Sequence, residues 1–286
     1  MTRVARAVAA VCLVAMAAAC GGSDGGSDDG SGGGPASRSP AAQAPSGARG
    51  AASWWRPKAG VSWQWQLSGK IDTSVPAAVY DVDLFETPAA TVAELHRAGR
   101  KVICYTAIGT AENWRPDYGR FPKAALGKGV DGWPGERWVD IRRIDAVRPI
   151  WASRLDQCKS KGFDAVEPDW MDGYQKDTGF PLTSAQQLAF NRMLADEAHR
   201  RGLAVGLKND LGQIPQLVGD MDFAVNEQCA QYGECERLTP FVRAGKPVFH
   251  AEYEIPPGRF CAESERLGLS SIRKAVELPA ERQACP

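Results

Sequence analysis

From Gly60 to the C-terminus, short apolar runs alternate with longer amphipathic segments, and this alternation restricts the chain to few folds. Strands separated by helices indicate βα units on a parallel sheet, because parallel neighbours need a crossover connection between them. We predict eight strands, at Val61–Leu67, Ala78–Phe85, Lys101–Ile108, Phe163–Asp169, Leu203–Asn209, Phe223–Glu227, Pro247–Tyr253 and Ser270–Val276.

Helices are predicted between these strands at Ala89–Ala98, Ile150–Lys161 and Ser184–Arg200. The second follows Pro149, a residue that commonly opens a helix. An open doubly wound sheet would also fit the alternation, but it usually carries a glycine-rich phosphate turn after its first strand. Residues 64–69 read QWQLSG, which is no such turn. The sequence therefore predicts an α/β fold with a single (β/α)8 TIM-type barrel.

The first 20 residues have the pattern of a secretory signal. Arg3 and Arg6 precede an apolar run over residues 8–18, which is too short to span a bilayer comfortably. The small residues that lead directly into Cys20 resemble a bacterial lipobox. That resemblance implies a lipoprotein signal peptide over residues 1–20, with cleavage before Cys20 and acylation of its thiol. An ordinary secretory signal in which Cys20 is incidental is the alternative.

Residues 21–52 consist largely of Gly, Ser, Asp, Pro and Ala, and too few apolar side chains are present to offset the entropy of ordering them. We expect a disordered linker here and one barrel domain over residues 53–286. The protein is then exported and monomeric, faces the extracytoplasmic side and contacts the membrane through a lipid anchor only. Basic and acidic residues are equal, at 34 each, and form no basic stripe, so nucleic acid is excluded as a partner.

Six cysteines remain beyond the predicted lipidation site. An even number in an exported chain suggests disulfides, although the number alone leaves many connectivities open. Spacing predicts Cys229–Cys235, which closes a short loop. Cys261–Cys285 would then pin the C-terminus and Cys104–Cys158 would be the remaining pair, but the sequence leaves these two pairings open. A zinc site is the alternative, but the chain has no CxxC pair and no HExxH helix, so no metal or cofactor is expected.

The carboxyl ends of barrel strands and the loops after them form the active site of such a fold. Five successive predicted strands end in a polar or charged group here, and tryptophans 63, 114, 133 and 138 lie in the predicted loops. Carboxylates can perform acid and nucleophile chemistry on an acetal, and flat aromatic faces pack on sugar rings. The set indicates a carbohydrate site. Any one carboxylate taken alone could instead cap the helix that follows.

Several strand-end sequences occur in an order that resembles a known family. They are WQWQL at 63–67, YDVDLF at 80–85, VICY at 102–105, VEPD at 166–169, GLKN at 206–209 and NEQC at 226–229. Together they resemble glycoside hydrolase family 114, the endo-α-1,4-polygalactosaminidases, over about residues 54–277.

The resemblance implies a hydrolase that cuts inside α-1,4-linked galactosamine or N-acetylgalactosamine exopolysaccharide. It places the two catalytic carboxylates on Asp169 and Glu227. Aspartate is short and suits a rigidly held nucleophile, while glutamate reaches further and suits the acid/base, although the reverse assignment stays open. By analogy with other barrel glycosidases we expect retention of configuration. Trp170 stands where the family often has Asn, and this departure concerns the neighbouring substrate subsite.

The remaining strand-end residues are predicted to bind substrate: Gln64, Asp81, Asp83, Tyr105, Trp170, Asp172, Lys208, Asn209, Glu252 and Tyr253. The surplus carboxylates would make an anionic cleft that attracts a cationic, partly deacetylated amino-sugar polymer, unless they pair with Lys208 and nearby arginines. Lys208 could alternatively form a Schiff base, but the acidic rim disfavours the neutral amine this needs. The alternative function is a non-catalytic polysaccharide-binding lipoprotein. Retention of both Asp169 and Glu227 favours the enzyme.

Overall fold

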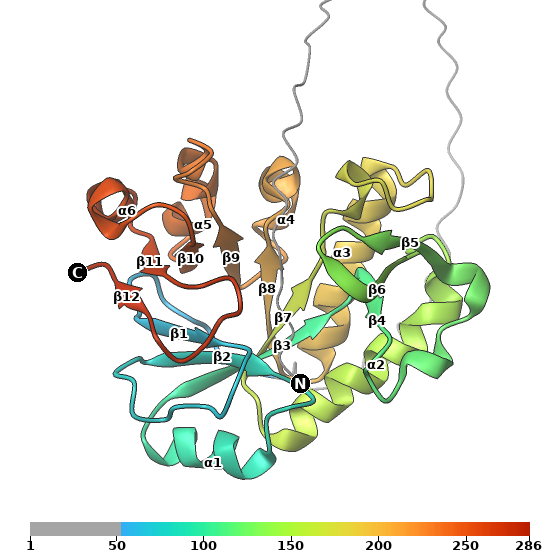
Figure 1. Cartoon of the computed structure of the whole chain (residues 1–286), viewed down its shortest axis with the longest axis horizontal. Coiled ribbons are helices and arrows are strands. Elements are labelled where there is room, and N and C mark those ends of the chain that lie inside the picture. The colour runs from blue at the N-terminus through green and yellow to red at the C-terminus, as the bar shows by residue number, and fades with distance from the viewer. Residues whose placement is uncertain (1–52) are drawn as a thin grey trace, which may run out of the picture. The chain divides into compact units, whose positions relative to one another are not determined.

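The computed structural model describes residues 53–286, so the predicted signal peptide, Cys20 and linker lie outside the described residues. A nine-stranded sheet forms the centre, in the order β1-β2-β3-β7-β8-β9-β10-β11-β12 (Figure 1). Its strands are β1 (Trp63–Gln66), β2 (Val79–Asp83), β3 (Lys101–Ala107), β7 (Ala165–Asp169), β8 (Ala204–Lys208), β9 (Phe223–Glu227), β10 (Val248–Glu252), β11 (Ser270–Arg273) and β12 (Gln283–Ala284). The first eight of these pair in parallel, and each matches a predicted strand.

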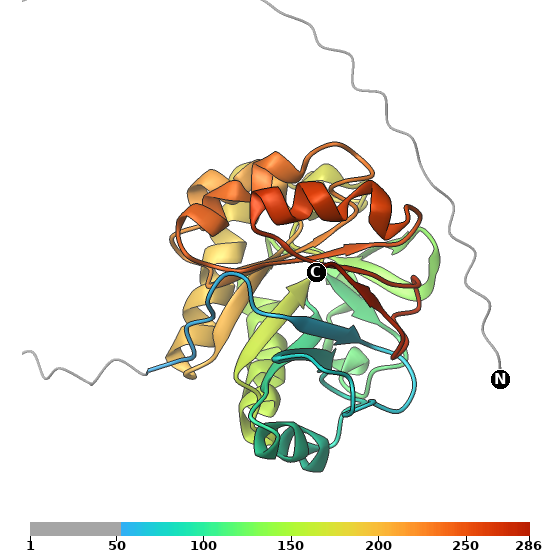
Figure 2. The same ribbon diagram turned by 90° about the vertical axis from the view of Figure 1, so that its left-hand side faces the viewer.

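The parallel sheet curls as in a TIM barrel, but its last ladder differs from the closed barrel that we expected. Within residues 53–286 no ladder joins β11 to β1, because β11 pairs with the antiparallel β12 instead. Side chains cross the seam: the Trp63 indole donates to the Ser270 carbonyl at 2.8 Å, and the Gln64 amide donates to the Ala280 carbonyl at 2.6 Å. The C-terminal segment thus lies beside β1 (Figure 2).

All three predicted helices are present. The helices are α1 (Ala89–Arg97), α2 (Ile144–Lys161), α3 (Ser184–Arg200), α4 (Ile214–Leu217), α5 (Thr239–Arg243) and α6 (Cys261–Leu267). Single 3₁₀ turns lie at Tyr118–Arg120, Lys123–Ala125, Gly173–Gln175, Leu211–Gln213, Cys235–Leu238 and Pro257–Arg259. Contrary to the prediction, Pro149 does not open α2 but lies inside it. A capping box between Thr183 and Gln186 fixes the start of α3.

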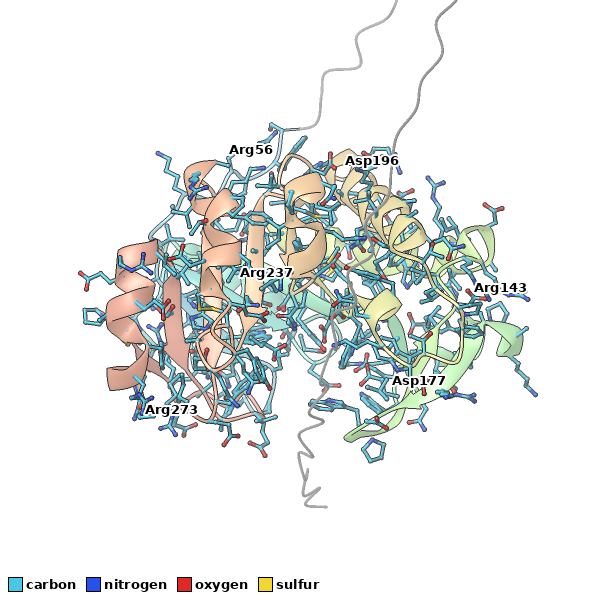
Figure 3. The ribbon with its side chains drawn as sticks, turned by 90° about the horizontal axis from the view of Figure 1, so that it is seen from above. Arg56, Arg143, Asp177, Asp196, Arg237 and Arg273 are labelled. Atoms are coloured by element: carbon cyan, nitrogen blue, oxygen red, sulfur yellow. A yellow bond between two sulfur atoms is a disulfide. The ribbon has the colours of Figure 1, made fainter. Side chains whose placement is uncertain are left out.

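Side chains alternate between the two faces of the curled sheet, as they must in any strand. The inner face carries a compact apolar cluster that includes Trp63, Trp65, Phe223 and Phe249. The outer face packs under the helices in a larger cluster. Trp63 lies in the first predicted strand although we also expected it among the loop aromatics; the structure makes it a core residue of β1. Charged side chains such as Arg56, Arg143 and Asp177 lie at the periphery (Figure 3).

A three-stranded antiparallel sheet separates β3 from α2, and the sequence analysis did not predict it. It consists of β4 (Thr110–Glu112), β5 (Leu126–Val130) and β6 (Trp133–Val139), in the order β4-β6-β5. We call it the β4–β6–β5 sheet. Because it follows directly on the carboxyl end of β3, it stands beside the end of the parallel sheet where a barrel binds its substrate (Figure 1).

The three predicted disulfides are all present. Cys104–Cys158 joins β3 to α2, Cys229–Cys235 closes the loop after β9, and Cys261–Cys285 ties the C-terminus to α6. Cys229, Cys235 and His250 have potential metal-binding atoms within 4.8 Å of one another, but the two sulfurs are bonded together and offer no thiolate. No helix among residues 53–286 is long and apolar enough to cross a membrane.

Candidate active site

A cavity opens at the carboxyl ends of the parallel strands, on the side expected for a barrel. Eight of the predicted site residues line it: Tyr105, Asp169, Trp170, Asp172, Lys208, Asn209, Glu227 and Tyr253. They lie at or directly after the carboxyl ends of β3, β7, β8, β9 and β10, and the parallel register brings them to one rim. These eight side chains therefore lie at one rim, as the strand-end pattern predicted.

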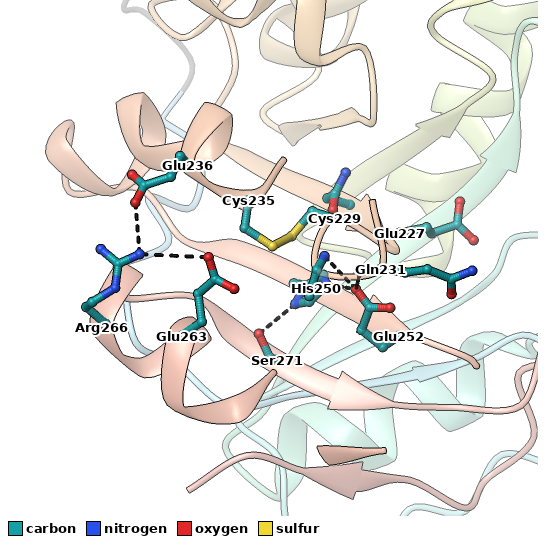
Figure 4. Close-up of a disulfide and its surroundings, with 12 residues drawn as sticks. Glu227, Cys229, Gln231, Cys235, Glu236, His250, Glu252, Glu263, Arg266 and Ser271 are labelled. Carbon is teal, nitrogen blue, oxygen red and sulfur yellow. Dashed lines mark hydrogen bonds and ion pairs between the residues drawn. A yellow bond between two sulfur atoms is a disulfide. The ribbon is translucent and has the colours of Figure 1, made fainter. Parts of the chain in front are cut away.

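Gln64 and Glu252 do not reach the cavity, and their predicted role in substrate binding is corrected. Both lie one position out of phase with the inward residues of their strands. The Gln64 amide is used at the seam of the sheet. Glu252 is buried on the outer face, where its Oε1 accepts hydrogen bonds from His250 and from the Ala230 N–H, both at 2.8 Å. Figure 4 shows Glu252 beside the Cys229–Cys235 disulfide, with the Glu227 carboxylate directed away from it.

Asp81 and Asp83 are also absent from the cavity wall. Asp83 Oδ1 accepts the N–H groups of Phe85 and Glu86, and its carboxylate makes an ion pair with Arg115 at 2.5 Å. For Asp83 the alternative interpretation is therefore correct: its carboxylate accepts backbone N–H groups and pairs with an arginine. Asp81 is fully buried beneath the cavity.

One ammonium group joins the carboxylates at the cavity floor. Lys208 Nζ lies 3.0 Å from Asp169 Oδ1, 3.2 Å from Glu167 Oε1 and 3.4 Å from Glu227 Oε2. Burial alone would lower the pKa of Lys208, but the charges of Asp169, Glu227 and Glu167 raise it well above its ordinary value. Lys208 therefore stays charged, and a charged ammonium is no nucleophile, which argues against a Schiff base.

A tyrosine hydroxyl fixes each of the two predicted catalytic carboxylates. Tyr105 donates to Asp169 Oδ2 at 2.8 Å, and Tyr253 donates to Glu227 Oε1 at 2.5 Å. Asn209 adds a donor to Glu227 Oε2 at 3.1 Å. The side chains of Asp169 and Glu227 are 13% and 28% exposed, whereas that of Lys208 is 3% exposed. The two carboxylates thus face the cavity while the lysine lies behind them.

The backbone turns sharply directly after each of the three charged strand ends. Trp170, Asn209 and Gln228 follow Asp169, Lys208 and Glu227 and have φ angles of +63°, +52° and +63°. Residues other than glycine rarely adopt this left-handed conformation, and non-glycine examples concentrate at functional sites. The turns end the strands at the rim, so that each charged side chain is the last inward residue of its strand.

The site also contains residues that the sequence analysis missed or left without a role. Trp65 lies on the inner face of β1, and the centroid of its ring is 4.8 Å from Lys208 Nζ. Glu112 and Glu136 face each other across the β4–β6–β5 sheet and line the cavity. Trp114 and Trp133, which we expected among the rim aromatics, also line it and are each 43% exposed. The alternation of β1 would have identified Trp65, but the acidic pair depends on an antiparallel pairing that no local pattern announced.

Glu136 is a perturbed carboxyl on this wall. Its side chain accepts a hydrogen bond from the Thr110 hydroxyl and has no cation within ion-pair distance among residues 53–286. Burial raises the pKa of Glu136 to about 7. Glu112 differs because Arg115 Nε lies 2.9 Å from its Oε2. The wall therefore holds a carboxyl group that titrates near neutral pH and lacks a counter-ion of its own.

Comparison with known proteins agrees with this geometry. Residues 44–286 match the sequence profile of Glycoside-hydrolase family GH114. The chain belongs to glycoside hydrolase family 114. The family that the strand-end sequences suggested is confirmed, and the protein is a glycoside hydrolase. A Deinococcus radiodurans protein, described only as uncharacterized, is 28% identical over 244 residues, which cover 73% of this chain and 78% of that protein.

Two solved structures extend the comparison. Aspergillus fumigatus Ega3, crystallised with galactosamine, is 41% identical, with a TM-score of 0.78 over 82% of this chain and 98% of that one. The glycoside hydrolase domain of Pseudomonas aeruginosa PelA is 15% identical, with a TM-score of 0.60 over 76% of this chain and 95% of that one. The second likeness supports the fold of this family 114 chain alone.

Trp170 is the position at which this family 114 chain departs from the pattern noted above. Its ring meets the Trp138 ring edge-on at 5.0 Å, and it lines the cavity beside Asp169. Gly109 makes this arrangement possible, because a Cβ there would lie 2.0 Å from the Trp170 carbonyl oxygen. The contact with Trp138 and the space left by Gly109 therefore allow Trp170 to form part of the cavity wall.

Proposed function

We propose that the protein is an endo-acting hydrolase of α-1,4-linked galactosamine polymers, with Asp169 and Glu227 as its catalytic pair. One observation carries this proposal: two carboxylates from β7 and β9 face the same cavity from opposite sides of a single ammonium group. A glycosidase needs such a pair on either side of the bond that it cleaves. The substrate follows from the likeness to Ega3, which is 41% identical and was crystallised with galactosamine.

The contacts of the two carboxylates support their separate roles. Asp169 is the less exposed, and Tyr105, Lys208 and its own neighbouring N–H hold it from three sides. A rigid, charge-stabilised carboxylate suits the nucleophile. Glu227 is more open to the cavity, so it can reach the leaving group and later a water molecule.

In the first step, Asp169 forms a bond to the anomeric carbon while Glu227 gives its proton to the departing glycosidic oxygen. In the second step, Glu227 takes a proton from water, whose oxygen displaces Asp169. Lys208 Nζ lies 3.0 Å from Asp169 Oδ1 and 3.4 Å from Glu227 Oε2, so one ammonium group bridges the two carboxylates. Retention is proposed by analogy with other barrel glycosidases, and it requires carboxyl groups about 5–5.5 Å apart.

The cavity wall supports a cationic amino sugar as the ligand. Its carboxyl groups outnumber its cations: Glu112, Glu136, Asp169, Asp172 and Glu227 stand against Lys176 and Lys208. The exposed faces of Trp114 and Trp133 offer surfaces on which sugar rings pack. An excess of negative charge attracts the protonated amino groups of a deacetylated polymer.

We further propose that residues 1–20 export the chain and that acylated Cys20 anchors it, with residues 21–52 as a spacer. The alternative function, a lipoprotein that binds the polysaccharide without cutting it, would need the same cavity but no paired carboxylates. The deciding experiment incubates the full chain with partly deacetylated α-1,4-galactosamine polymer and measures the products by mass spectrometry. Oligosaccharides of several lengths are expected. Binding without products would overturn the enzymatic role for this substrate.

A further inference from the structure

Asp81 and Glu167 form a buried carboxyl pair directly beneath the catalytic cavity. Asp81 comes from β2 and Glu167 from β7, and both side chains are 0% exposed. Each carboxyl group acts on the pKa of the other, and burial together with the charge of Glu167 raises the pKa of Asp81. Among residues 53–286, no N–H, hydroxyl or amide donor makes a hydrogen bond to any of their four oxygens. A fully buried carboxyl group with no donor and no cation of its own is stable only when it keeps its proton, and it can then donate to a neighbouring carboxylate.

The surroundings of the pair allow it only one negative charge. The inner face around it is apolar, with Trp65 and Ile103 beside Asp81 in register. The charged groups that face the pair are Lys208, Asp169 and Glu227. Lys208 is the one cation among them, and its Nζ lies 3.2 Å from Glu167 Oε1. Two neighbouring buried carboxyl groups that share one cation cannot both be ionised.

The position of Lys208 indicates which partner is neutral. Glu167 is the member of the pair in ion-pair contact with the ammonium group, so the charged form is favoured there. Burial and the charge of Glu167 raise the pKa of Asp81 well above its ordinary value. The proton therefore belongs on Asp81.

We propose that Asp81 stays protonated during catalysis and donates to Glu167, whose single charge holds Lys208 in place and balances it. This proposal rests on the proposed function, in which Lys208 lies between the nucleophile and the acid/base. When Glu167 is charged, its negative charge balances the positive charge of Lys208. The ammonium group then does not draw the proton away from Glu227, which must donate it. Without that charge, Lys208 would favour loss of the proton from Glu227 before substrate is protonated. Asp81 and Glu167 are positioning residues, since neither lines the cavity.

Infrared spectroscopy on the full chain tests the proton without reference to activity. Asp210 is another buried aspartate, and burial raises its pKa to about 8, so Asp210→Asn is the background in which to measure. With carbon-13 in the aspartate carboxyls, we expect one protonated aspartate band to persist at pH 8. The further change Asp81→Asn should remove that band. If no protonated aspartate band remains at pH 8 in the Asp210→Asn background, the proposal is overturned, whether or not the Asp81 variant folds.

The pH dependence of kcat/KM tests whether the charge of Glu167 helps Glu227 to keep its proton. Asn at position 81 keeps a neutral donor to Glu167, so Asp81→Asn should change kcat/KM by no more than about threefold and leave the basic limb in place. Adding Glu167→Gln removes the charge, and the basic limb should move to lower pH by about one unit. Asp210→Asn is the matched control, because it removes a buried carboxyl that makes no contact with Lys208. The basic limb of its kcat/KM profile should stay where it is in the wild type.

The outcomes separate this proposal from the proposed function. If Asp81→Asn shifts the basic limb as far as the double variant does, Asp81 was ionised and the proposal is wrong. If the wild-type chain cleaves no galactosamine polymer, the proposed function fails, while the infrared result still decides whether Asp81 holds the proton.

Discussion

Lys208 Nζ lies 3.0 Å from Asp169 Oδ1. The contact joins the ends of β7 and β8, and the same nitrogen lies 3.4 Å from Glu227 Oε2 at the end of β9. A single buried ammonium group thus fixes the geometry between two carboxylates that come from strands far apart in the sequence. The chemistry that we propose depends on this arrangement, and the first two predictions test it.

Removing either of the two carboxyl groups that we propose as catalytic should abolish cleavage and preserve the fold. Asp169→Asn and Glu227→Gln are near-isosteric, and each should lower kcat/KM by about 10³-fold or more, because the two groups act in one reaction. The rate of product release from the polymer measures this, and thermal unfolding checks the fold. Glu254→Gln, an exposed carboxyl next to Tyr253 but off the cavity wall, is the matched control. Full activity in either catalytic variant would rule out the pair.

Lys208→Met should be costly for both stability and activity. Methionine preserves the length of the side chain but leaves Glu167 buried without its cation. Breaking a buried ion pair in this way costs about 3–5 kcal/mol of unfolding free energy. The rate of cleavage should fall about 100-fold or more because Asp169 loses its fixed position. Urea denaturation and single-turnover kinetics measure the two effects. A variant with unchanged stability would show that the ammonium group is not needed to balance these carboxylates.

Glu136→Gln should change the pH dependence of the free energy of unfolding. Burial raises the pKa of Glu136 from its ordinary value of 4.5 to about 7, so the folded chain binds this proton more tightly than the unfolded chain. The resulting stability is fully present below about pH 4.5 and is lost as the pH rises to about 7.

Glutamine does not ionise, so the variant should gain on the order of 3 kcal/mol relative to wild type between pH 4 and pH 8. Urea denaturation across this range measures the difference. Glu254→Gln removes an exposed carboxyl and should show no comparable trend. A constant difference between Glu136→Gln and wild type would contradict the prediction.

The disulfides should differ in their contribution to stability because they close loops of different length. Cys104 and Cys158 are 54 positions apart, whereas Cys229 and Cys235 are 6 apart. Replacing the first pair with alanine should cost about 4 kcal/mol and replacing the second about 2 kcal/mol. Chemical denaturation of the two double variants measures this order. The second pair also braces the loop after Glu227, so its loss should lower activity more than the loss of Cys261–Cys285 does.

Cys20→Ser should release the protein from the membrane fraction. The proposed anchor depends on acyl chains attached to this thiol, and several chains bind a bilayer strongly whereas none does not. Cell fractionation followed by immunoblotting measures the distribution. Equal membrane association of the variant and wild type would show that Cys20 is no lipidation site.

Much of the fold could be predicted from the sequence because its signals are local. Apolar runs and helical periodicity located every parallel strand, and the order of the strands followed from their βα connections. The short spacing of Cys229 and Cys235 predicted their disulfide, whereas the other two pairings stayed open until the structure placed them. Strand-end motifs identified the family, and they predicted that Asp169, Lys208 and Glu227 lie at one rim.

Only the tertiary structure decided which of the remaining polar residues reach the cavity. Strand alternation turns neighbours to opposite faces, so Gln64 and Glu252 point away while Trp65 and Tyr253 point in. The β4–β6–β5 sheet brings Glu112 opposite Glu136, 24 positions along the chain. Asp81 of β2 and Glu167 of β7 are both fully buried beside the site although β3 lies between their strands. Such contacts depend on non-local packing, and no pattern confined to one stretch of sequence encodes them.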